Sequence, residues 1–298
     1  MEVTTSAQRF REAADEARGR GRDLGFVPTM GALHQGHGRL LKSARDECGF
    51  VAMSIFVNPF QFDSQGDLDT YPRRLQADSA VGAALGCDLV FAPAEAEMYP
   101  AGRSEVTVDP GPLGDRLEGR SRPGHFRGVL TVVAKLFSLA GPCRAYFGEK
   151  DAQQLALVRR MVDDLNAPVT VVGCPTVREI DGLALSSRNM LLPPEERRAA
   201  PVLFEALSTA AGLVRKGERG ADVIRATIAR QIGAEPLARL DYVAVVDDSS
   251  WEEAAVIEGP ARALVAARFG AVRLIDNLVL PWDAGESRHN TGESRGAT

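Results

Sequence analysis

The segment LGFVPTMGALHQGHGRLL, residues 24–41, decides the fold of this chain. It begins as a short apolar run, turns through Gly31 and Gly36, and continues into a stretch with helical periodicity. A strand that leads through a glycine turn into a helix is the repeating unit of α/β proteins, whose sheets are parallel. The segment therefore predicts a parallel sheet, and the sequence on either side extends the pattern.

Short β-rich runs alternate with amphipathic helical stretches up to Pro175. The predicted strands are 24–27, 51–57, 88–92, 144–147 and 169–172, and the predicted helices between them are 39–47, 76–85, 128–139 and 153–165. Residues 1–23 add a charged N-terminal helix. This alternation predicts an α/β fold with a doubly wound parallel sheet. Ligands of such sheets bind beyond the carboxyl ends of the strands, where the strand order reverses.

The pattern changes after Pro175. A long helix over 193–216 and a second over 221–232 precede three strand-like runs, 240–246, 263–269 and 272–278. This order predicts a smaller α+β C-terminal domain. We therefore expect one domain over 1–176, a second over 177–284, and a disordered tail over 285–298, which is polar and lacks periodicity.

Composition narrows the class of protein. Of 298 residues, 45% are hydrophobic and 25% charged, which excludes a fibrous or disordered chain. The net charge of −5 gives no general attraction to nucleic acid or anionic membranes. The longest apolar stretch, 128–141, is too short to span a bilayer. The N-terminus lacks a secretory signal and the four cysteines lie far apart, so we expect a cytoplasmic protein with buried thiols and no zinc site.

Two histidines, His34 and His37, lie where the predicted turn enters a helix. The free N–H groups and positive dipole end of a helix N-terminus stabilise phosphate groups. Imidazoles three residues apart can donate hydrogen bonds to phosphate oxygens whose charge grows in a transition state. The alternatives are two ordinary loop histidines or a metal-binding pair, although no H-E-x-x-H or third ligand is nearby.

A second polar cluster, AYFGEKDAQQ at 145–154, also follows a predicted strand and enters a helix. Lysine is rare in this chain, and Lys150 at a strand end can place a point charge on phosphate oxygens. Asp151 can cap the helix, the commoner role, or hold a magnesium-bound water. Gln154 can point a neutral amide at a polar substrate.

Three further stretches carry candidate ligand contacts. Ser186, Ser187 and Arg188, in a loop between the predicted domains, suit the β- and γ-phosphates of a nucleotide, although Ser-Ser-Arg is also common in solvated loops. SIFVNPFQF at 54–62 offers two amides amid apolar residues, as a small, partly apolar ligand requires. GRSRPGHFR at 119–127 is either an anion-binding loop or a solvated charge run.

Several common motifs are absent from the sequence. There is no G-x-x-x-x-G-K-[ST], no G-x-G-x-x-G after a strand and no G-x-S-x-G. P-loop transferases, dinucleotide oxidoreductases and serine hydrolases are therefore disfavoured.

The motifs together resemble one family. PTMGALHQGH, FVNPFQF, DLDTYPR, GRSRPGHFRGV, YFGEKDAQQL, DGLALSSRN and LDYVAVVD occur in the order found in the pantoate–β-alanine ligase (pantothenate synthetase) family, over residues 3–283. The resemblance implies a Rossmann-like N-terminal domain of the adenylyl-transferring superfamily that includes class I aminoacyl-tRNA synthetases. His34 and His37 then resemble its HIGH-type signature, and residues 185–188 its KMSKS-type loop.

The resemblance also implies a reaction and a set of site residues. ATP activates pantoate as pantoyl adenylate, and β-alanine then gives pantothenate, AMP and pyrophosphate; the enzyme is a homodimer that uses Mg²⁺. The expected ATP-binding residues are Thr29, Met30, Gly31, His34, Gly36, His37, Gly148, Glu149, Lys150, Asp151, Val177, Leu185, Ser186, Ser187 and Arg188. The expected substrate-binding residues are Met30, Asn58, Gln61, Arg122, His125 and Gln154. We expect His34, His37, Lys150 and Arg188 to be catalytic, and Mg²⁺ to arrive on the ATP phosphates without protein ligands of its own.

Gln61 and Gln154 resemble the family's pantoate-binding residues, and the resemblance implies that Gln61 also lies near β-alanine. Three positions depart from the family pattern: Gly38 replaces an apolar residue, Ala152 an often aromatic one, and Phe60 a smaller one. Two other functions stay open, a nucleotidylyltransferase acting on a phosphorylated acceptor and a non-catalytic nucleotide sensor. Pyrophosphate release with a carboxylate substrate distinguishes all three.

Overall fold

The computed structural model describes residues 1–62 and 65–282, so the expected tail lies outside the described residues. Contacts divide the chain into two units, Met1–Pro193 and Pro194–Thr298. The sequence placed the boundary after residue 176, where the pattern changes. In the structure residues 177–193 group with the first unit, and Arg188 in this segment pairs with Asp67 at 3.6 Å.

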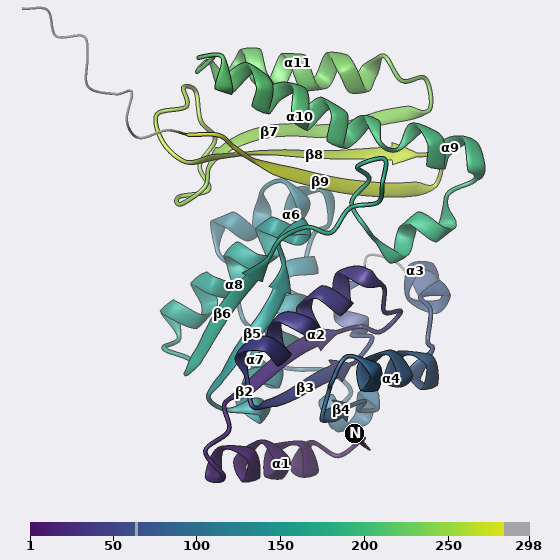
Figure 1. Cartoon of the computed structure of the whole chain (residues 1–298), viewed down its shortest axis with the longest axis vertical. Coiled ribbons are helices and arrows are strands. Elements are labelled where there is room, and N and C mark those ends of the chain that lie inside the picture. Colours follow the sequence, from purple (N-terminus) through teal and green to yellow (C-terminus); the bar gives the residue numbers. More distant parts are fainter. Residues whose placement is uncertain (63–64, 283–298) are drawn as a thin grey trace, which may run out of the picture. The chain divides into compact units, whose positions relative to one another are not determined.

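The first unit contains a six-stranded sheet in which all neighbouring strands are parallel (Figure 1). Its strands are β1 (Glu2–Thr4), β2 (Leu24–Thr29), β3 (Phe50–Ile55), β4 (Leu89–Phe91), β5 (Cys143–Gly148) and β6 (Val169–Cys174). Their order is β1-β4-β3-β2-β5-β6, so the chain runs from β2 to β3 and β4 on one side and then returns to β5 on the other. The predicted α/β parallel fold is confirmed, and its order reverses between β2 and β5.

Helices cover both faces of this sheet because the strands alternate their side chains. In β2, Phe26 joins a core with α1 (Ala7–Gly19), α7 (His125–Ala140) and α8 (Ala152–Asp164). The next residue, Val27, joins a separate core with α2 (Gln35–Glu47). Such period-two alternation buries a parallel strand on both sides.

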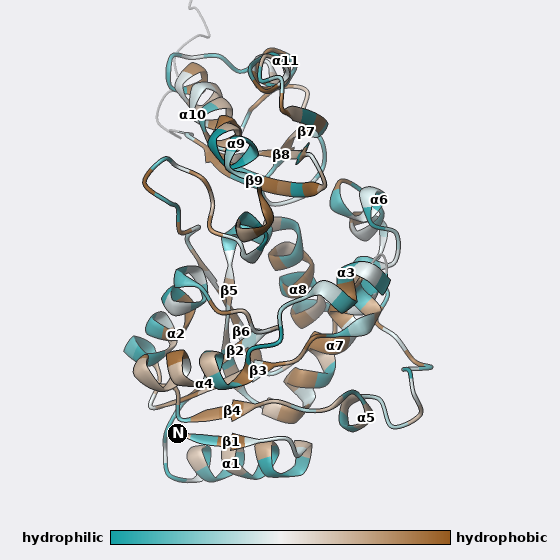
Figure 2. Cartoon of the chain, turned by 90° about the vertical axis from the view of Figure 1, so that its right-hand side faces the viewer, coloured by the Kyte–Doolittle hydropathy of each residue, from teal (hydrophilic) through white to brown (hydrophobic). Residues whose placement is uncertain are grey.

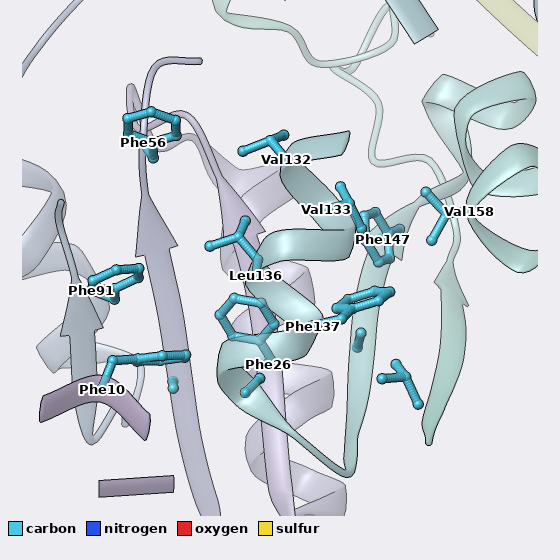
Figure 3. Close-up of a cluster of buried hydrophobic side chains, with 14 of the residues drawn as sticks. Phe10, Phe26, Phe56, Phe91, Val132, Val133, Leu136, Phe137, Phe147 and Val158 are labelled. Carbon is cyan, nitrogen blue, oxygen red and sulfur yellow. The ribbon is translucent and has the colours of Figure 1, made fainter. Parts of the chain in front are cut away.

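Aromatic residues fill the larger core. Phe10 and Phe91 stack with ring centroids 4.8 Å apart, and both are fully buried. Figure 3 shows Phe137 and Leu136 of α7 pointing toward the sheet beside Phe26. Each such side chain contributes about 1.5–3 kcal/mol when removed from water, so this core fixes α7 and the strands that end at the site.

Short helical segments connect the main elements of this unit. They are η1 (Pro59–Gln61), α3 (Gln65–Thr70), α4 (Leu75–Ala84), α5 (Glu95–Met98), η2 (Pro112–Asp115), α6 (Glu118–Ser121), η3 (Glu149–Asp151) and η4 (Ser187–Leu191).

Two elements differ from the sequence prediction. The helix predicted over 1–23 begins only at Ala7, because residues 2–4 form β1, which pairs with β4. The helix predicted over 193–216 is two helices, α9 (Pro194–Ala199) and α10 (Val202–Arg215). Pro201 lies between them, and proline lacks the N–H that a continuous helix would need there.

The second unit has a three-stranded antiparallel sheet of order β7-β8-β9. Its strands are β7 (Ala238–Asp247), β8 (Ala261–Phe269) and β9 (Val272–Leu280), and α10 and α11 (Ala221–Gly233) pack against them. Figure 2 shows brown, apolar residues along β9, as along β4 of the first unit. The predicted α+β C-terminal domain is confirmed in its elements.

The four cysteines are free thiols, three of them buried and Cys143 half-buried. Within the described ranges, no helix has the length and apolar character needed to cross a membrane.

Candidate active site

Two polar loops meet where the strand order reverses. One follows β2 and the other follows β5, and these strands are neighbours in the sheet. A cavity of about 170 Å³ lies between the loops. It is lined by Met30, His34, Gly36, His37, Leu40, Tyr71, Gly148, Lys150, Asp151, Pro175, Thr176, Val177, Leu185, Ser186, Ser187 and Arg188. Segments distant in the sequence thus share one cavity at the topological switch point, where α/β proteins bind ligands.

The turn after β2 is held by a buried carboxylate. Gly31 and Ala32 both have positive φ, +81° and +51°, which is costly for alanine. Asp78 of α4 is 4% exposed and accepts hydrogen bonds from the backbone N–H groups of Ala32 (2.9 Å) and Leu33 (2.8 Å). A Cβ on Gly31 would lie 2.9 Å from an Asp78 oxygen, so the position requires glycine.

The two histidines cap α2 through their own rings. His34 Nδ1 accepts from the Gly36 N–H at 3.1 Å, and His37 Nδ1 accepts from the His34 N–H at 3.4 Å. A neutral imidazole whose Nδ1 accepts carries its proton on Nε2. Their ring centroids are 4.2 Å apart. The cap therefore leaves both histidines with an Nε2–H as their remaining donor.

The environment keeps both rings neutral at neutral pH. Burial, and then the charge of Lys150, lowers the pKa of His34, while Asp151 opposes them. Burial, and then His34, lowers the pKa of His37 to about 3. Neutral rings keep the Nδ1 lone pairs that accept the hydrogen bonds of the cap. The cap and the lowered pKa values are therefore both consistent with neutral imidazoles.

The loop after β5 contributes charges of both signs. Lys150 Nζ lies 3.8 Å from an Asp151 oxygen, and the lysine side chain is only 19% exposed. The protein around Asp151 reduces its solvation, which acts to raise its pKa. The positive charges of Lys150, Arg188 and Arg122, together with a contribution from His125, outweigh that effect and lower the pKa of Asp151 overall. Asp151 is therefore an ionised carboxylate among cationic side chains.

The opposite wall is built from residues 186–188 and the segment around α3. Ser186 caps η4 by accepting from the Arg188 N–H at 3.2 Å. The Arg188 guanidinium lies 3.6 Å from Asp67, and both side chains are over a third exposed. Tyr71 lines the same cavity, and burial raises its pKa although Arg188 and Ser187 act to lower it, so the tyrosine keeps its proton.

The volume of this cavity, about 170 Å³, is smaller than the roughly 300–1,000 Å³ typical of sites that bind small molecules and cofactors. A second cavity of about 650 Å³ shares His34, Leu185, Ser186 and Ser187 with it. The Asp67–Arg188 ion pair lies on the wall of the smaller cavity that residues 186–188 build.

A buried amide network lies beside the cavity. The Gln61 carbonyl accepts from His125 Nδ1 (2.7 Å) and from Arg122 (3.2 Å). The Gln61 carboxamide accepts from Asn58 Nδ2 at 3.1 Å, and its Nε2 lies 3.0 Å from Met30 Sδ. Met30 lines the cavity, so the Gln61 amino group contacts one of the residues that form it.

Eight of the predicted site residues do not line the 170 Å³ cavity: Thr29, Gly31, Asn58, Gln61, Arg122, His125, Glu149 and Gln154. Several of them support residues that do. Thr29 Oγ1 donates to the Ser54 carbonyl and accepts from the Gly31 N–H, tying the end of β2 to β3. Gln154 lies half-buried in the first turn of α8, next to Gln153, whose amide is used to hold residues 113–118.

Sequence reasoning missed five residues of the site. Leu40, Tyr71, Pro175 and Thr176 line the cavity, and Asp78 anchors the turn. Tyr71 belongs to the motif DLDTYPR, but its place in that motif does not indicate a role for the side chain. Asp78 sits in a helix far along the chain from the turn, so only the folded structure connects them.

The three unusual positions lie around the site. A Cβ on Gly38 would meet only Leu85 at 3.4 Å, an ordinary contact. Phe60 is 40% exposed and packs edge-on against Tyr99. Ala152 is buried at the start of α8.

The metal-pair alternative for the histidines finds no further ligands. Among residues 1–62 and 65–282, no group of three His, Cys, Asp or Glu side chains is arranged to hold a metal ion.

Comparison with known proteins agrees with this geometry. The family model described as pantoate-beta-alanine ligase matches residues 2–279. The pantothenate synthetase of Rubrobacter xylanophilus is 51% identical over 283 residues, covering 93% of this chain and 97% of that protein. The pantothenate synthetase of Chloroflexus aggregans is 53% identical over 282 residues, covering 94% and 99%.

Solved structures give the same result. A crystal structure of pantothenate synthetase from Thermus thermophilus superposes with a TM-score of 0.88 at 48% identity, covering 94% of this chain and 99% of that one. Pantoate-beta-alanine ligase from Francisella tularensis, complexed with beta-gamma ATP and beta-alanine, superposes with a TM-score of 0.76 at 35% identity, covering 94% and 97%.

Proposed function

The chain belongs to the pantoate–β-alanine ligase family, and from that premise we propose how its residues divide the work of an ATP-dependent ligation of pantoate with β-alanine. The observation that carries the proposal is the convergence of His34, His37, Lys150 and Arg188 on one cavity at the switch point. Four side chains with hydrogen-bond donors that line a common space suit a triphosphate, whose oxygens need several partners at once.

In the proposed first step, a carboxylate oxygen of pantoate attacks the α-phosphorus of ATP. A phosphorus–oxygen bond forms to pantoate, the bond to the β-phosphate oxygen breaks, and pyrophosphate leaves. The reaction brings an anion to a polyanion, so its barrier falls mainly through positioning and charge neutralisation. Lys150 and Arg188 supply positive charge, and His34 and His37 supply neutral Nε2–H donors at the start of α2.

In the proposed second step, the amine of β-alanine attacks the acyl carbon of pantoyl adenylate. The new carbon–nitrogen bond replaces the bond to AMP, and the amine loses a proton. Gln61 and Gln154 hold pantoate in this scheme, and no side chain becomes acylated. Neutral amides suit a substrate with hydroxyl groups and a single carboxylate because they orient it without adding charge.

Mg²⁺ is proposed as part of the substrate, carried in on the ATP phosphates. Asp151, ionised and lining the cavity, would hold a water of the metal's shell, and the ion would neutralise phosphate charge. Magnesium usually keeps several waters and takes one or two carboxylates, so a single aspartate fits.

The test is an omission assay. Purified protein is incubated with ATP, Mg²⁺, pantoate and β-alanine, each omitted in turn, while pyrophosphate and pantothenate are measured. We expect positional isotope exchange in ATP to require pantoate but not β-alanine. Exchange that waits for β-alanine would contradict the adenylate step, and pyrophosphate release without pantoate would contradict the ligase itself.

We also propose, from the family resemblance, a homodimer that works in the cytoplasm and binds neither membranes nor nucleic acid. The net charge of −5 supports the last point. Sedimentation equilibrium tests the dimer: a monomer at all micromolar concentrations would contradict it.

A further inference from the structure

We propose that the hydroxyl of Tyr99 is a positioning group for the ligation: through Asn58 it fixes the Gln61 carboxamide so that Gln61 meets its substrate as a hydrogen-bond donor. The inference rests on the proposed assignment of Gln61 to pantoate. Tyr99 follows α5 and lies outside every motif in which we sought catalytic residues.

Asn58 is the centre of the arrangement. It is 1% exposed, and each of its polar groups is used. Its Oδ1 accepts from the Tyr99 hydroxyl (2.8 Å) and from the Phe60 N–H (3.4 Å). Its Nδ2 donates to the Gly128 carbonyl and to Gln61 Oε1, both at 3.1 Å. Two donors on the oxygen and two acceptors on the nitrogen allow only one orientation of this amide.

The orientation of Asn58 determines that of Gln61. Since Asn58 presents an N–H, Gln61 must turn its oxygen inward, and its Nε2 then lies 3.0 Å from Sδ of Met30, a residue that lines the cavity. A thioether is a weak acceptor. The amino group of Gln61 is therefore available for a stronger one, such as an oxygen of the pantoate carboxylate or hydroxyls.

Tyr99 is suited to this role because it is a rigid donor. Tyr99 is 2% exposed, and Phe60 packs edge-on against it with ring centroids 4.7 Å apart. The ring of Phe56 is tilted against that of Tyr99, with centroids 6.1 Å apart. Burial raises the pKa of Tyr99, so the hydroxyl keeps its proton. The Asn58 oxygen therefore receives a permanent hydrogen bond.

The backbone around Gln61 is fixed independently of Tyr99. His125 and Arg122 hold the Gln61 carbonyl. A Cβ on Gly128 would lie 2.1 Å from the Phe60 carbonyl oxygen, so α7 contacts η1 backbone to backbone. Loss of the Tyr99 hydroxyl should therefore disturb the amide orientation while the main chain of η1 stays in place.

The experiment is a double-mutant cycle between Tyr99→Phe and Gln61→Ala, read as steady-state KM for pantoate and for ATP. We expect Tyr99→Phe to raise the KM for pantoate about 3- to 20-fold, the effect of weakening one hydrogen bond, with the KM for ATP within twofold of wild type. In the Gln61→Ala background, Tyr99→Phe should change the KM for pantoate less than twofold.

Tyr146→Phe is the matched control. Tyr146 is a fully buried tyrosine of the same unit whose hydroxyl donates to Glu47, at the end of α2 away from the site. We expect Tyr146→Phe to lower the melting temperature without raising the KM for pantoate. A second variant, Asn58→Asp, replaces the N–H donor by an acceptor and should turn the Gln61 oxygen toward the substrate, lowering kcat/KM for pantoate more than Tyr99→Phe does.

The outcomes separate the two proposals. An unchanged KM for pantoate in Tyr99→Phe overturns the positioning role, as does an equal effect of Tyr99→Phe with and without the Gln61 side chain. If Gln61→Ala itself leaves the KM for pantoate unchanged, the proposed assignment of Gln61 fails. If Gln61→Ala raises that KM and Tyr99→Phe does not, only the role of Tyr99 fails.

Discussion

The two walls of the candidate site are built in opposite ways. The wall after β2 is fixed by buried and partly buried hydrogen bonds, in which Asp78 holds the turn and the two histidine rings cap α2. The facing wall is held by an exposed ion pair of Arg188 with Asp67. Buried bonds to charged groups are worth about 1.5–3 kcal/mol, whereas exposed ion pairs are worth about 0–1 kcal/mol.

This difference suits a reaction that needs both geometry and access. Donors that neutralise charge in a transition state act best when they are preorganised. A polyanionic ligand larger than the cavity must nevertheless enter, and only the weakly held wall can move at small cost. The first wall is therefore suited to holding donors in fixed positions, and the second is suited to admitting a ligand.

The largest effect should come from the donors themselves. We expect His37→Ala and Lys150→Ala each to slow adenylate formation about 10²- to 10³-fold, the loss typical of one preorganised donor. Single-turnover assays with ATP and pantoate measure it. Lys42→Ala is the control, because Lys42 is exposed on α2 and pairs only with Asp46 among the ion pairs of the described chain. Wild-type adenylation in both variants would remove these residues from the mechanism.

The next effect tests the anchor of the fixed wall. Asp78→Asn keeps the shape but places an amino group against one of two backbone N–H donors. We expect a loss of about 1.5–3 kcal/mol in the free energy of unfolding and at least a tenfold lower kcat/KM for ATP, because the His34 turn shifts. Urea unfolding and steady-state kinetics measure the two. A variant with normal stability and kinetics would show that the turn keeps its conformation without the Asp78 carboxylate.

The third prediction concerns pH. The pKa of His37 is about 3 when folded, against an ordinary 6.5, so the unfolded chain takes up a proton first as the pH falls. The lowered pKa of His37 therefore stabilises the folded state fully above pH 6.5, and this contribution is lost as the pH falls toward 3. We expect the free energy of unfolding to be about 1–2 kcal/mol lower at pH 5 than at pH 7. Thermal melting at a series of pH values measures this difference. His37→Gln should flatten the dependence, and an equally steep loss in that variant would assign it to other groups.

A smaller effect concerns the start of α2. Gly38→Ala should stabilise the protein by about 0.5–1 kcal/mol through helix propensity, because the added Cβ meets only an ordinary contact. Gly36→Ala is the matched opposite, since its Cβ would lie 2.7 Å from His34 Cε1 and would push the ring out of the cap. Melting temperatures that move in the same direction in both variants would contradict the fixed geometry of this wall.

The smallest effect tests the weakly held wall. Asp67→Ala should change stability by less than about 1 kcal/mol, as for an exposed pair, and should lower the KM for ATP about two- to fivefold, because Arg188 no longer has to leave a carboxylate. Urea unfolding measures the stability, and steady-state kinetics with varied ATP measures the KM. A higher KM would show that Asp67 helps to hold the nucleotide.

Much of the fold could be predicted because its signals are local. The strand, turn and helix around residues 24–47 follow from apolar periodicity and two glycines, and the same holds for the other sheet strands except β1. That strand has three residues, too few for a period, and it exists because β4 offers an unpaired edge. Pro201 is a local signal for the end of a helix, but the apolar periodicity continues on both sides of it and predicted one long helix instead of α9 and α10.

The sequence by itself determined the α/β class, the two loops at the reversal of strand order and the polar residue types that line the cavity between them. These depend on short-range periodicity, on backbone conformations that favour glycine and on motifs whose letters are contiguous. Only the tertiary structure decided that Asp78 holds the histidine turn, that Tyr71 lines the cavity, and that Tyr99 and Asn58 set the direction of the Gln61 amide. Hydrogen bonds between residues far apart in the chain leave no periodic trace in it, since their partners are chosen by the packing of the folded core.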